Sequence, residues 1–280
     1  MVVGMKKRYD WLNIIKYVFL IIFTIIIIYP VIMVFIGSFR NNMSIMTDPF
    51  GLPDKLDFVN YVKAWVNGML YALYKNSVIV TFASVALIVI FSSMIAFVLS
   101  RRDFKLKKVF FPMIIIGMTI PFQVGIIPVY LQMSKFRLVD TYIGLIILYV
   151  VNYLSFSTYI MYGFFKKVPV EIQEASAIDG CGNFRMYLNI IMPLSPAVVT
   201  TVSIFNLMFV WNDMFFSLVM MRSKLMKTLN VGLLSFKGQY QSDYATMFAG
   251  IILVSIPMIV IFLLLQKRFI EGVSSGAVKG

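Results

Sequence analysis

Residues 168–193 carry the most chemically distinctive side chains in a chain that is otherwise strongly apolar. Three carboxylates and two glycines gather in this stretch: Glu171, Glu174, Asp179, Gly180 and Gly182. Carboxylates can pair with cations of another protein or accept hydrogen bonds from backbone N–H groups. The chain has no histidine and a single cysteine, Cys181, which excludes imidazole chemistry, metal sites built on these ligands and internal disulfides. Most enzyme chemistries therefore lack their usual residues in this chain.

The same stretch must lie in water, and its pattern predicts two helices. Pro169 stands where a helix can begin, with acidic residues in the early turns. Three apolar residues recur on one face of this helix: Ile172, Ala175 and Ile178. Gly180 and Gly182 should end it, because glycine is costly inside a helix and suits a sharp reversal. A second helical segment follows at residues 184–192, so we predict a helix–turn–helix at the membrane surface.

The composition indicates a polytopic membrane protein. Of the 280 residues, 60% are apolar, 16% are aromatic and only 13% are charged, and the charges cluster between long apolar runs. We predict an all-α fold, a single transmembrane domain over residues 1–280 with six transmembrane helices. The expected spans are residues 17–36, 76–100, 109–131, 142–165, 197–221 and 244–266, followed by a C-terminal tail at 267–280. Pro30 should kink the first span, and three prolines, Pro112, Pro121 and Pro128, predict a broken third span.

The positive charges predict the orientation of these spans. Of the 25 lysines and arginines, 15 fall in the segments that share a side with the termini. Five cations crowd residues 101–108, and Lys166 and Lys167 close the fourth span. Such clusters at span ends belong in the cytoplasm. Both termini should therefore be cytoplasmic, and the net charge of +13 reflects membrane orientation rather than nucleic-acid binding.

The polar stretch resembles the cytoplasmic signature of permease subunits in bacterial ABC importers. That signature is Glu-Ala-Ala, three residues, Gly, nine residues and Ile-x-Leu-Pro, and here it runs from Glu174-Ala175-Ser176 through Gly180 to Ile190-Ile191-Met192-Pro193. Every spacing is kept, with Ser176 and Met192 as conservative substitutions. The resemblance implies that residues 168–193, the coupling loop, dock on a separate ATPase. Its expected contact residues are Glu171, Glu174, Ala175, Ser176, Asp179, Gly180 and Pro193.

Further fragments are similar to the MalG-type permease subunits of carbohydrate importers. They are Asn60-Tyr61, Asn76-Ser77, Ile120-Pro121, Ile127-Pro128, Pro169, Trp211-Asn212-Asp213 and the terminal Gly-Ala-Val-Lys-Gly. This resemblance implies a second ATPase contact through the tail residues Gly276, Val278, Lys279 and Gly280; the alternative is a frayed terminus. It also implies that residues 224–240 of the outer loop, which spans residues 222–243, enter the sugar cleft of a binding protein, with Lys237, Gly238 and Tyr240 as candidate contacts. The alternative for that loop is a solvated connector.

Several polar and aromatic residues inside the predicted spans are candidates for the translocation path. Polar groups in lipid are expensive and usually face a cavity or another helix. The candidates are Asn152, Tyr153, Asn206, Trp211, Asn212 and Asp213. They offer hydrogen bonds and flat apolar faces to a sugar, but such asparagines also hold helices together.

The predicted function is that of one permease subunit of an ATP-driven importer for a sugar or oligosaccharide in the bacterial cytoplasmic membrane. The chain has no Gly-x4-Gly-Lys-Ser/Thr sequence, so it should carry no cofactor, and ATP and Mg would bind to partner ATPase subunits. The expected partners are a second permease subunit, an ATPase dimer, an extracytoplasmic binding protein and lipid. It should not be an enzyme. One alternative is a self-contained secondary transporter, which is disfavoured because no repeat is visible and Asp213 is the only acid inside or close to an apolar segment. The other is an ABC permease for a non-sugar solute.

Overall fold

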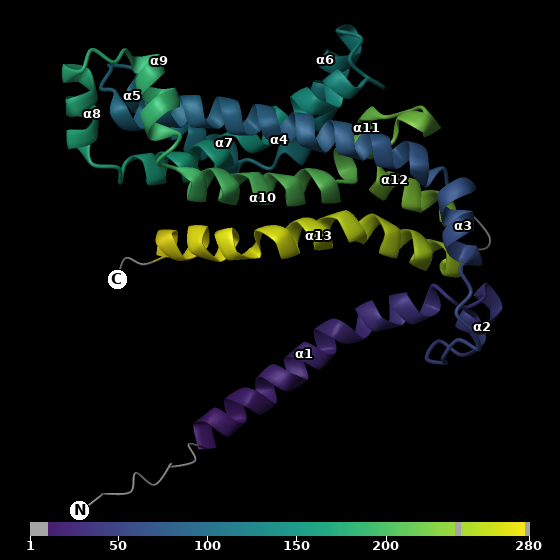
Figure 1. Ribbon diagram of the computed structural model, residues 1–280. Coiled ribbons are helices and arrows are strands. Elements are labelled where there is room, and N and C mark those ends of the chain that lie inside the picture. Colours follow the sequence, from purple (N-terminus) through teal and green to yellow (C-terminus); the bar gives the residue numbers. More distant parts are fainter. Residues whose placement is uncertain (1–10, 239–241, 278–280) are drawn as a thin grey trace, which may run out of the picture. The chain divides into compact units, whose positions relative to one another are not determined.

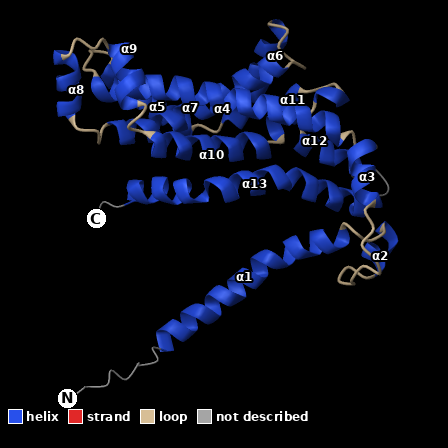
Figure 2. Cartoon of the chain, viewed as in Figure 1, coloured by secondary structure: helices blue, strands red, loops and turns tan. Residues whose placement is uncertain are grey.

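A computed structural model describes residues 11–238 and 242–277 of the chain (Figure 1). All regular secondary structure in this part of the chain is helical, as predicted from the composition (Figure 2). The chain divides into two compact units, residues 1–68 with 235–253 and residues 69–234 with 254–280. Within the described residues, four helices are long and apolar enough to cross a membrane, and the count rises to six if each of two bent helix pairs forms one span.

The first unit contains α1 (Trp11–Gly37), α2 (Asn42–Thr47), α3 (Val59–Val66) and the start of α13 (Tyr244–Ala277). α1 is apolar and exposed along its length, as expected for a helix that contacts lipid, and Pro30 lies inside it. The segment after α1 is tied to α3 by polar side chains. The amide of Asn60 donates hydrogen bonds to the carbonyls of Ser38 and Arg40 at 2.9 and 2.8 Å. The Tyr61 hydroxyl lies 2.7 Å from the Ser38 hydroxyl.

The second unit is built on α4 (Leu70–Arg101) and α7 (Tyr142–Phe165), which pack along each other. Its other helices are α5 (Lys107–Thr119), η1 (Phe122–Gly125), α6 (Ile126–Lys135), α8 (Val170–Ile178), α9 (Asn183–Met186), η2 (Tyr187–Ile191), α10 (Pro196–Asn212), α11 (Phe215–Met220), η3 (Lys224–Met226) and α12 (Leu229–Leu233), while η4 (Leu234–Phe236) begins at its last residue. Two apolar clusters hold this unit. One surrounds Phe97 and Phe165 near the coupling loop, and the other surrounds Leu148 and Phe216 at the opposite ends of α4 and α7.

The third apolar segment is broken, which confirms the prediction from its prolines. Residues 107–119 and 122–135 form helices that meet at an angle of 88°. The break falls at Ile120 and Pro121. Pro121 has no N–H to continue the α5 ladder, and its ring disfavours helical backbone at Ile120, which is extended with ψ at 119°.

Other boundaries differ from the prediction. α4 begins at Leu70, six residues before the expected second span, and α13 continues as helix through the expected tail to Ala277. α10 ends at Asn212, although the fifth span was expected to reach residue 221. The cause is Asp213, whose carboxylate accepts hydrogen bonds from the N–H groups of Phe216 and Ser217 in the first turn of α11. A new helix therefore starts inside an apolar run that looks continuous.

Candidate coupling loop, outer loop and translocation path

The coupling loop folds as two short helices joined by a tight turn at the end of α7. α8 ends where Gly180 adopts a left-handed backbone conformation with φ at +73°. The N–H of Gly180 bonds the Ala177 carbonyl at 3.1 Å, and the N–H of Cys181 bonds the Ser176 carbonyl at 3.0 Å. These bonds close the carbonyl end of the helix. The left-handed conformation explains the glycine, since side chains with a Cβ are disfavoured there.

The second half of the coupling loop is embedded in the membrane helices. Met186, Tyr187 and Ile191 are buried in the apolar cluster that contains Phe97 of α4 and Phe165 of α7. The Tyr187 hydroxyl lies 2.7 Å from the hydroxyl of Ser93 on α4, and both groups are buried. Because a buried hydroxyl needs a hydrogen-bond partner, this contact fixes η2 at one position along α4.

The first half of the coupling loop is anchored by Arg101, the last residue of α4. Its Nη2 donates hydrogen bonds to the carbonyls of Phe165 at 2.5 Å and Val168 at 2.6 Å. These carbonyls lie at and just beyond the C-terminus of α7, where the helix dipole favours a cation. Arg101 thus joins the ends of α4 and α7 to the residue from which α8 departs.

The outward side of the coupling loop leaves large apolar side chains uncovered. Ile178 is 86% exposed, Phe184 is 65% exposed and Val170 is 55% exposed. The expected contact residues Glu171, Glu174, Ala175, Asp179, Gly180 and Pro193 are also exposed. Ser176 differs from them: it is 4% exposed, and its hydroxyl donates to the Gln173 carbonyl at 2.7 Å. Exposed apolar groups of this size on a rigid support suit a protein interface.

The predicted apolar face of α8 divides between two environments. Ile172 packs against the buried cluster near Phe97, whereas Ala175 and Ile178 point away from the unit. The two exposed residues are therefore the part of this face that remains open to a partner. The sequence pattern alone could not separate these roles, because helical spacing gives a common face but not the angle at which that face meets its support.

The start of the outer loop is tied to α4 by Asn76 and Ser77. The Asn76 amide donates to the carbonyls of Leu225 and Lys227 at 2.7 and 2.9 Å. Its oxygen accepts a hydrogen bond from the Tyr142 hydroxyl at 2.6 Å. The Ser77 hydroxyl accepts the N–H of Leu229 at 2.8 Å. The start of the outer loop, as far as α12, is therefore held to α4.

Replacing Asn76 with aspartate should loosen this attachment, because a carboxylate cannot donate to the carbonyls of Leu225 and Lys227. Because these two carbonyls are only partly buried, leaving them unpaired should cost about 1 kcal/mol each. We expect faster tryptic cleavage after Lys224 and Lys227 in the membrane-embedded protein. The matched control is Asn212→Asp, since Asn212 is exposed and its side chain bonds, among the described residues, only the Met208 carbonyl of its own helix. Equal cleavage of both variants would contradict the role of Asn76.

A second anchor of the outer loop lies just before α7. Asp140 has a left-handed backbone with φ at +62°, and its N–H bonds the Met220 carbonyl at 2.9 Å. Its carboxylate accepts the N–H groups of Arg222 and Ser223, both at 3.0 Å. The Arg222 guanidinium also bonds the Tyr130 hydroxyl. Asp140 therefore fixes the point at which the chain leaves α11.

The polar candidates for the translocation path occupy different environments. Asn206 is fully buried and donates to the Ser157 hydroxyl and the Val202 carbonyl, both at 2.8 Å, so it joins α10 to α7. Trp211 is 4% exposed, and its indole N–H bonds the Val254 carbonyl of α13 at 3.1 Å. Asp213 accepts the Tyr149 hydroxyl at 2.7 Å in addition to the N–H groups of α11. Each of these three side chains makes contacts that hold helices together.

The aromatic candidates form a row on α7 and α10. Tyr153 stacks on Phe209 with ring centres 5.3 Å apart and on Tyr149 at 6.4 Å. Phe209 in turn stacks on Phe205 and meets Phe156 edge-on. Phe209 is 38% exposed, and Tyr153 and its neighbour Asn152 are half-buried. This row presents flat apolar faces at the surface of the unit.

Some predicted contact residues lie at or beyond the limits of the described chain. Tyr240 of the outer loop and Val278, Lys279 and Gly280 of the tail fall outside the described residues. Gly276 lies in the last turn of α13. Lys237 and Gly238 follow η4, and both are exposed.

Several residues with structural roles at these sites were not singled out by sequence reasoning. Arg101 was assigned only to the cation cluster that sets orientation, and Ser93, Tyr149 and Tyr187 look like ordinary members of apolar helices. Asn60-Tyr61 and Asn76-Ser77 belong to the fragments that carry the family resemblance, but the sequence gives them no physical role. Both pairs anchor the loops that precede or face them.

Comparison with known proteins places the chain in a family. A family model described as "Binding-protein-dependent transport system inner membrane component" matches residues 88–275. A putative ABC transporter permease protein, ORF2, of Caldicellulosiruptor sp. strain Rt8B.4 is 36% identical over 94% of this chain and 96% of the relative. The diacetylchitobiose uptake system permease protein NgcG of Streptomyces coelicolor is 30% identical over 94% of this chain and 87% of the relative.

A solved structure supports the fold independently. The structure of a bacterial ABC transporter involved in the import of the acidic polysaccharide alginate matches with a TM-score of 0.84, over 95% of this chain and 100% of that chain, at 24% identity. The helical membrane fold is therefore that of an importer permease, which agrees with the family match over two thirds of the sequence. The chain belongs to the family of inner membrane components of binding-protein-dependent transport systems.

Proposed function

We propose that this chain is one permease subunit of an ATP-driven importer for a sugar or oligosaccharide. It would line half of the translocation path and do no covalent chemistry. The observation that carries the proposal is the coupling loop, which is fixed to α4 and α7 by Arg101 and Tyr187 yet leaves Ile178 and Phe184 uncovered. A rigid support with an uncovered apolar surface is what a lever needs when it is driven by another protein.

The proposed partners follow from this role. Two ATPase subunits would bind ATP and Mg and grip the coupling loop, with the end of α13 as a second contact. A homologous permease would complete the path, and an extracytoplasmic binding protein would deliver the cargo to the outer loop. Both termini would be cytoplasmic, because the cation clusters at 101–108 and at Lys166-Lys167 then lie on the cytoplasmic side of the membrane.

The geometry also supports a means of transmitting movement. α4 and α7 carry the coupling loop at one pair of ends, through Arg101, and the outer loop at the other, through Asn76 and Asp140. When ATP closes the ATPase pair, a displacement of the coupling loop would move this helix pair and the outer loop together. ATP binding and cargo release would then favour the same conformation, which is the condition for coupling.

The sugar assignment rests on the names of relatives and on the aromatic row of α7 and α10. A relative at 30% identity is named for the uptake of diacetylchitobiose. Stacked rings such as Tyr153 and Phe209 offer flat apolar faces, and sugars present flat apolar C–H surfaces between their hydroxyl groups. The row would therefore serve as a low-specificity track for the cargo.

Replacing Phe209 with leucine should slow uptake, because leucine keeps the apolar volume but removes the flat face. A lost stacking contact of about 1 kcal/mol corresponds to roughly a fivefold lower maximal rate at saturating binding protein. Phe23→Leu on the exposed helix α1 is the matched control and should leave uptake unchanged. Equal uptake rates in both variants would show that Phe209 does not contact the cargo.

The proposed function is tested by purification and reconstitution. The tagged chain should co-purify with stoichiometric ATPase subunits and a second permease. In liposomes this complex should accumulate a sugar from a panel containing diacetylchitobiose, raffinose and maltotriose only when ATP and a binding protein are supplied. Uptake by the isolated chain driven by an ion gradient, or failure of every sugar where another solute is imported, would overturn the proposal.

A further inference from the structure

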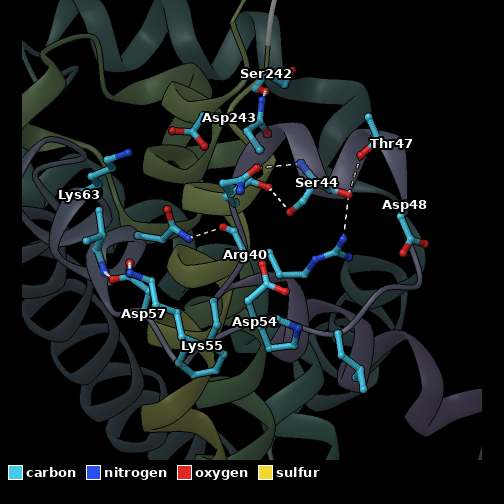
Figure 3. A pocket seen from close by; sticks show the side chains of 18 residues that line it. Arg40, Ser44, Thr47, Asp48, Asp54, Lys55, Asp57, Lys63, Ser242 and Asp243 are labelled. Atoms are coloured by element: carbon cyan, nitrogen blue, oxygen red, sulfur yellow. Dashed lines mark hydrogen bonds and ion pairs between the residues drawn. The ribbon is translucent and has the colours of Figure 1, made fainter.

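The first unit contains a polar cavity of about 830 Å³ that the coupling loop and the aromatic row leave unexplained (Figure 3). It lies where the segment after α1, the segment before α3 and the start of α13 meet. Its lining mixes acids, cations and amides with a few apolar residues such as Phe39 and Leu52. Arg40 is only 7% exposed and forms part of the wall. This volume falls within the range of sites that bind small molecules.

The cavity has unused hydrogen-bonding capacity. Arg40 donates to the Ser44 carbonyl at 2.8 Å through Nη2, which accounts for one of its five N–H groups. Within the part of the chain that the structure describes, Arg40 has no ion pair, and the side chains of Asp54 and Lys63 have neither a hydrogen bond nor an ion pair. A nearly buried guanidinium without an acidic partner normally finds other polar contacts. Acceptors and donors are therefore both available to a ligand.

Other acids at the rim are already committed to the backbone. The Asp57 carboxylate accepts the N–H of Val59 at 3.0 Å, and this hydrogen bond lowers its pKa, so it stays charged at neutral pH. The Asp243 carboxylate accepts the N–H and hydroxyl of Thr246 at the start of α13. These residues fix the shape of the cavity, while the exposed side chains of Asp54 and Lys63 and the nearly buried Arg40 line it with further hydrogen-bonding groups.

A second hollow of about 380 Å³ adjoins the first and shares Lys63 and Asp243 with it. Its lining includes Ser235, Phe236 and Gly238 of the outer loop. The two hollows thus extend from Arg40 to the segment that is proposed to unload the binding protein. Lys63 stands at their junction, where a ligand leaving the outer loop would meet it.

We propose that this cavity is a vestibule that holds the released sugar before it enters the membrane path. The inference rests on the proposed function and assigns a second sugar site to the same importer. Sugar hydroxyls donate and accept at once, so a neutral saccharide uses carboxylates, a guanidinium and an ammonium together. A purely anionic or cationic ligand would meet like charges on this mixed wall. The vestibule keeps the sugar from escaping during the interval between its release and its passage inward.

The test is a double substitution, Asp54→Asn with Lys63→Gln, in the reconstituted importer. It removes one carboxylate and one ammonium, so the net charge and long-range attraction for the binding protein are unchanged. The assay measures ATP hydrolysed per sugar imported, with the sugar from the panel that supports ATP-dependent uptake. The amides of these variants still form hydrogen bonds, but neutral ones, and losing the charge assistance of two bonds weakens retention about tenfold, so the ratio should rise by a similar factor. Lys135→Gln, an exposed lysine of the second unit, is the control and should leave the ratio unchanged.

The possible results distinguish a sugar vestibule from a docking site for the binding protein and from a cavity with neither role. A raised ratio with normal binding-protein stimulation of ATPase supports the vestibule. An unchanged ratio with a raised binding-protein concentration for half-maximal ATPase would overturn it and assign the cavity to protein docking. An unchanged ratio with unchanged stimulation would also overturn it. Basal ATPase activity and complex yield show that the variant is assembled. If no sugar supports uptake by the unmodified importer, it is the proposed function that fails.

Discussion

Replacing Gly180 with asparagine is expected to leave the chain inserted in the membrane but to reduce ATP-driven uptake about tenfold or more. Asparagine tolerates the left-handed backbone that Gly180 adopts, so the turn after α8 should survive. A Cβ at this position meets nothing within 4 Å in the chain itself. Any obstruction must therefore come from the ATPase, and an overpacked contact costs about 1–3 kcal/mol, which exceeds the 1.4 kcal/mol that equals a factor of ten.

Two further variants separate the backbone of Gly180 from the room that it leaves. Gly180→Ala adds only a methyl group but strains the left-handed turn by about 1–2 kcal/mol. If conformation is what matters, alanine is more harmful than asparagine; if a close approach matters, asparagine is more harmful. Gly182→Asn is the matched control, because Gly182 has an ordinary φ of −67° and open space around it. Normal coupling in both the Gly180→Asn and the Gly180→Ala variants would contradict the lever.

The sequence predicted the coupling loop well because its signals are local. A positive φ is rarely adopted by residues other than glycine, asparagine and aspartate. A glycine that follows a helical pattern therefore predicts the left-handed backbone conformation that Gly180 adopts. The break in the third apolar segment could also be predicted from the sequence. Pro121 has no N–H for the helix and restricts the backbone of Ile120 in any tertiary context. Backbone conformations that are set by a residue itself or by its immediate neighbour can therefore be predicted from the sequence.

The sequence was less informative where a residue acts on a distant part of the chain. Asp213 starts a new helix inside an apolar run, and its carboxylate is also held by Tyr149 on α7, 64 positions earlier. Asn76 fixes carbonyls about 150 positions away. A polar residue in an apolar segment indicates that a partner exists, but its identity depends on helix packing that periodicity does not specify. The same reason hides the cavity around Arg40, which is assembled from three segments.

Replacing Arg101 with glutamine is expected to detach the first half of the coupling loop from α4. Arg101 holds the carbonyls of Phe165 and Val168 with charge-assisted hydrogen bonds at the C-terminus of α7. Hydrogen bonds to charged groups contribute about 1.5–3 kcal/mol each, and because Arg101 is partly accessible to water we expect a total loss of about 2 kcal/mol. This corresponds to roughly 30-fold faster local opening. Hydrogen exchange at the amides of Lys167 and Val168 measures it directly.

Arg102→Gln provides the control that isolates this anchor from the charge of the cluster. Both substitutions remove one cation from residues 101–108, so any effect on membrane orientation or lipid attraction is the same for both. Arg102 makes no hydrogen bond to the end of α7 in the described chain. Only Arg101→Gln should therefore accelerate exchange and lower uptake per ATP. Equal effects would mean that residues 101–108 act through charge alone. A selective effect of Arg101→Gln would show that rigidity at this junction makes the coupling loop a lever.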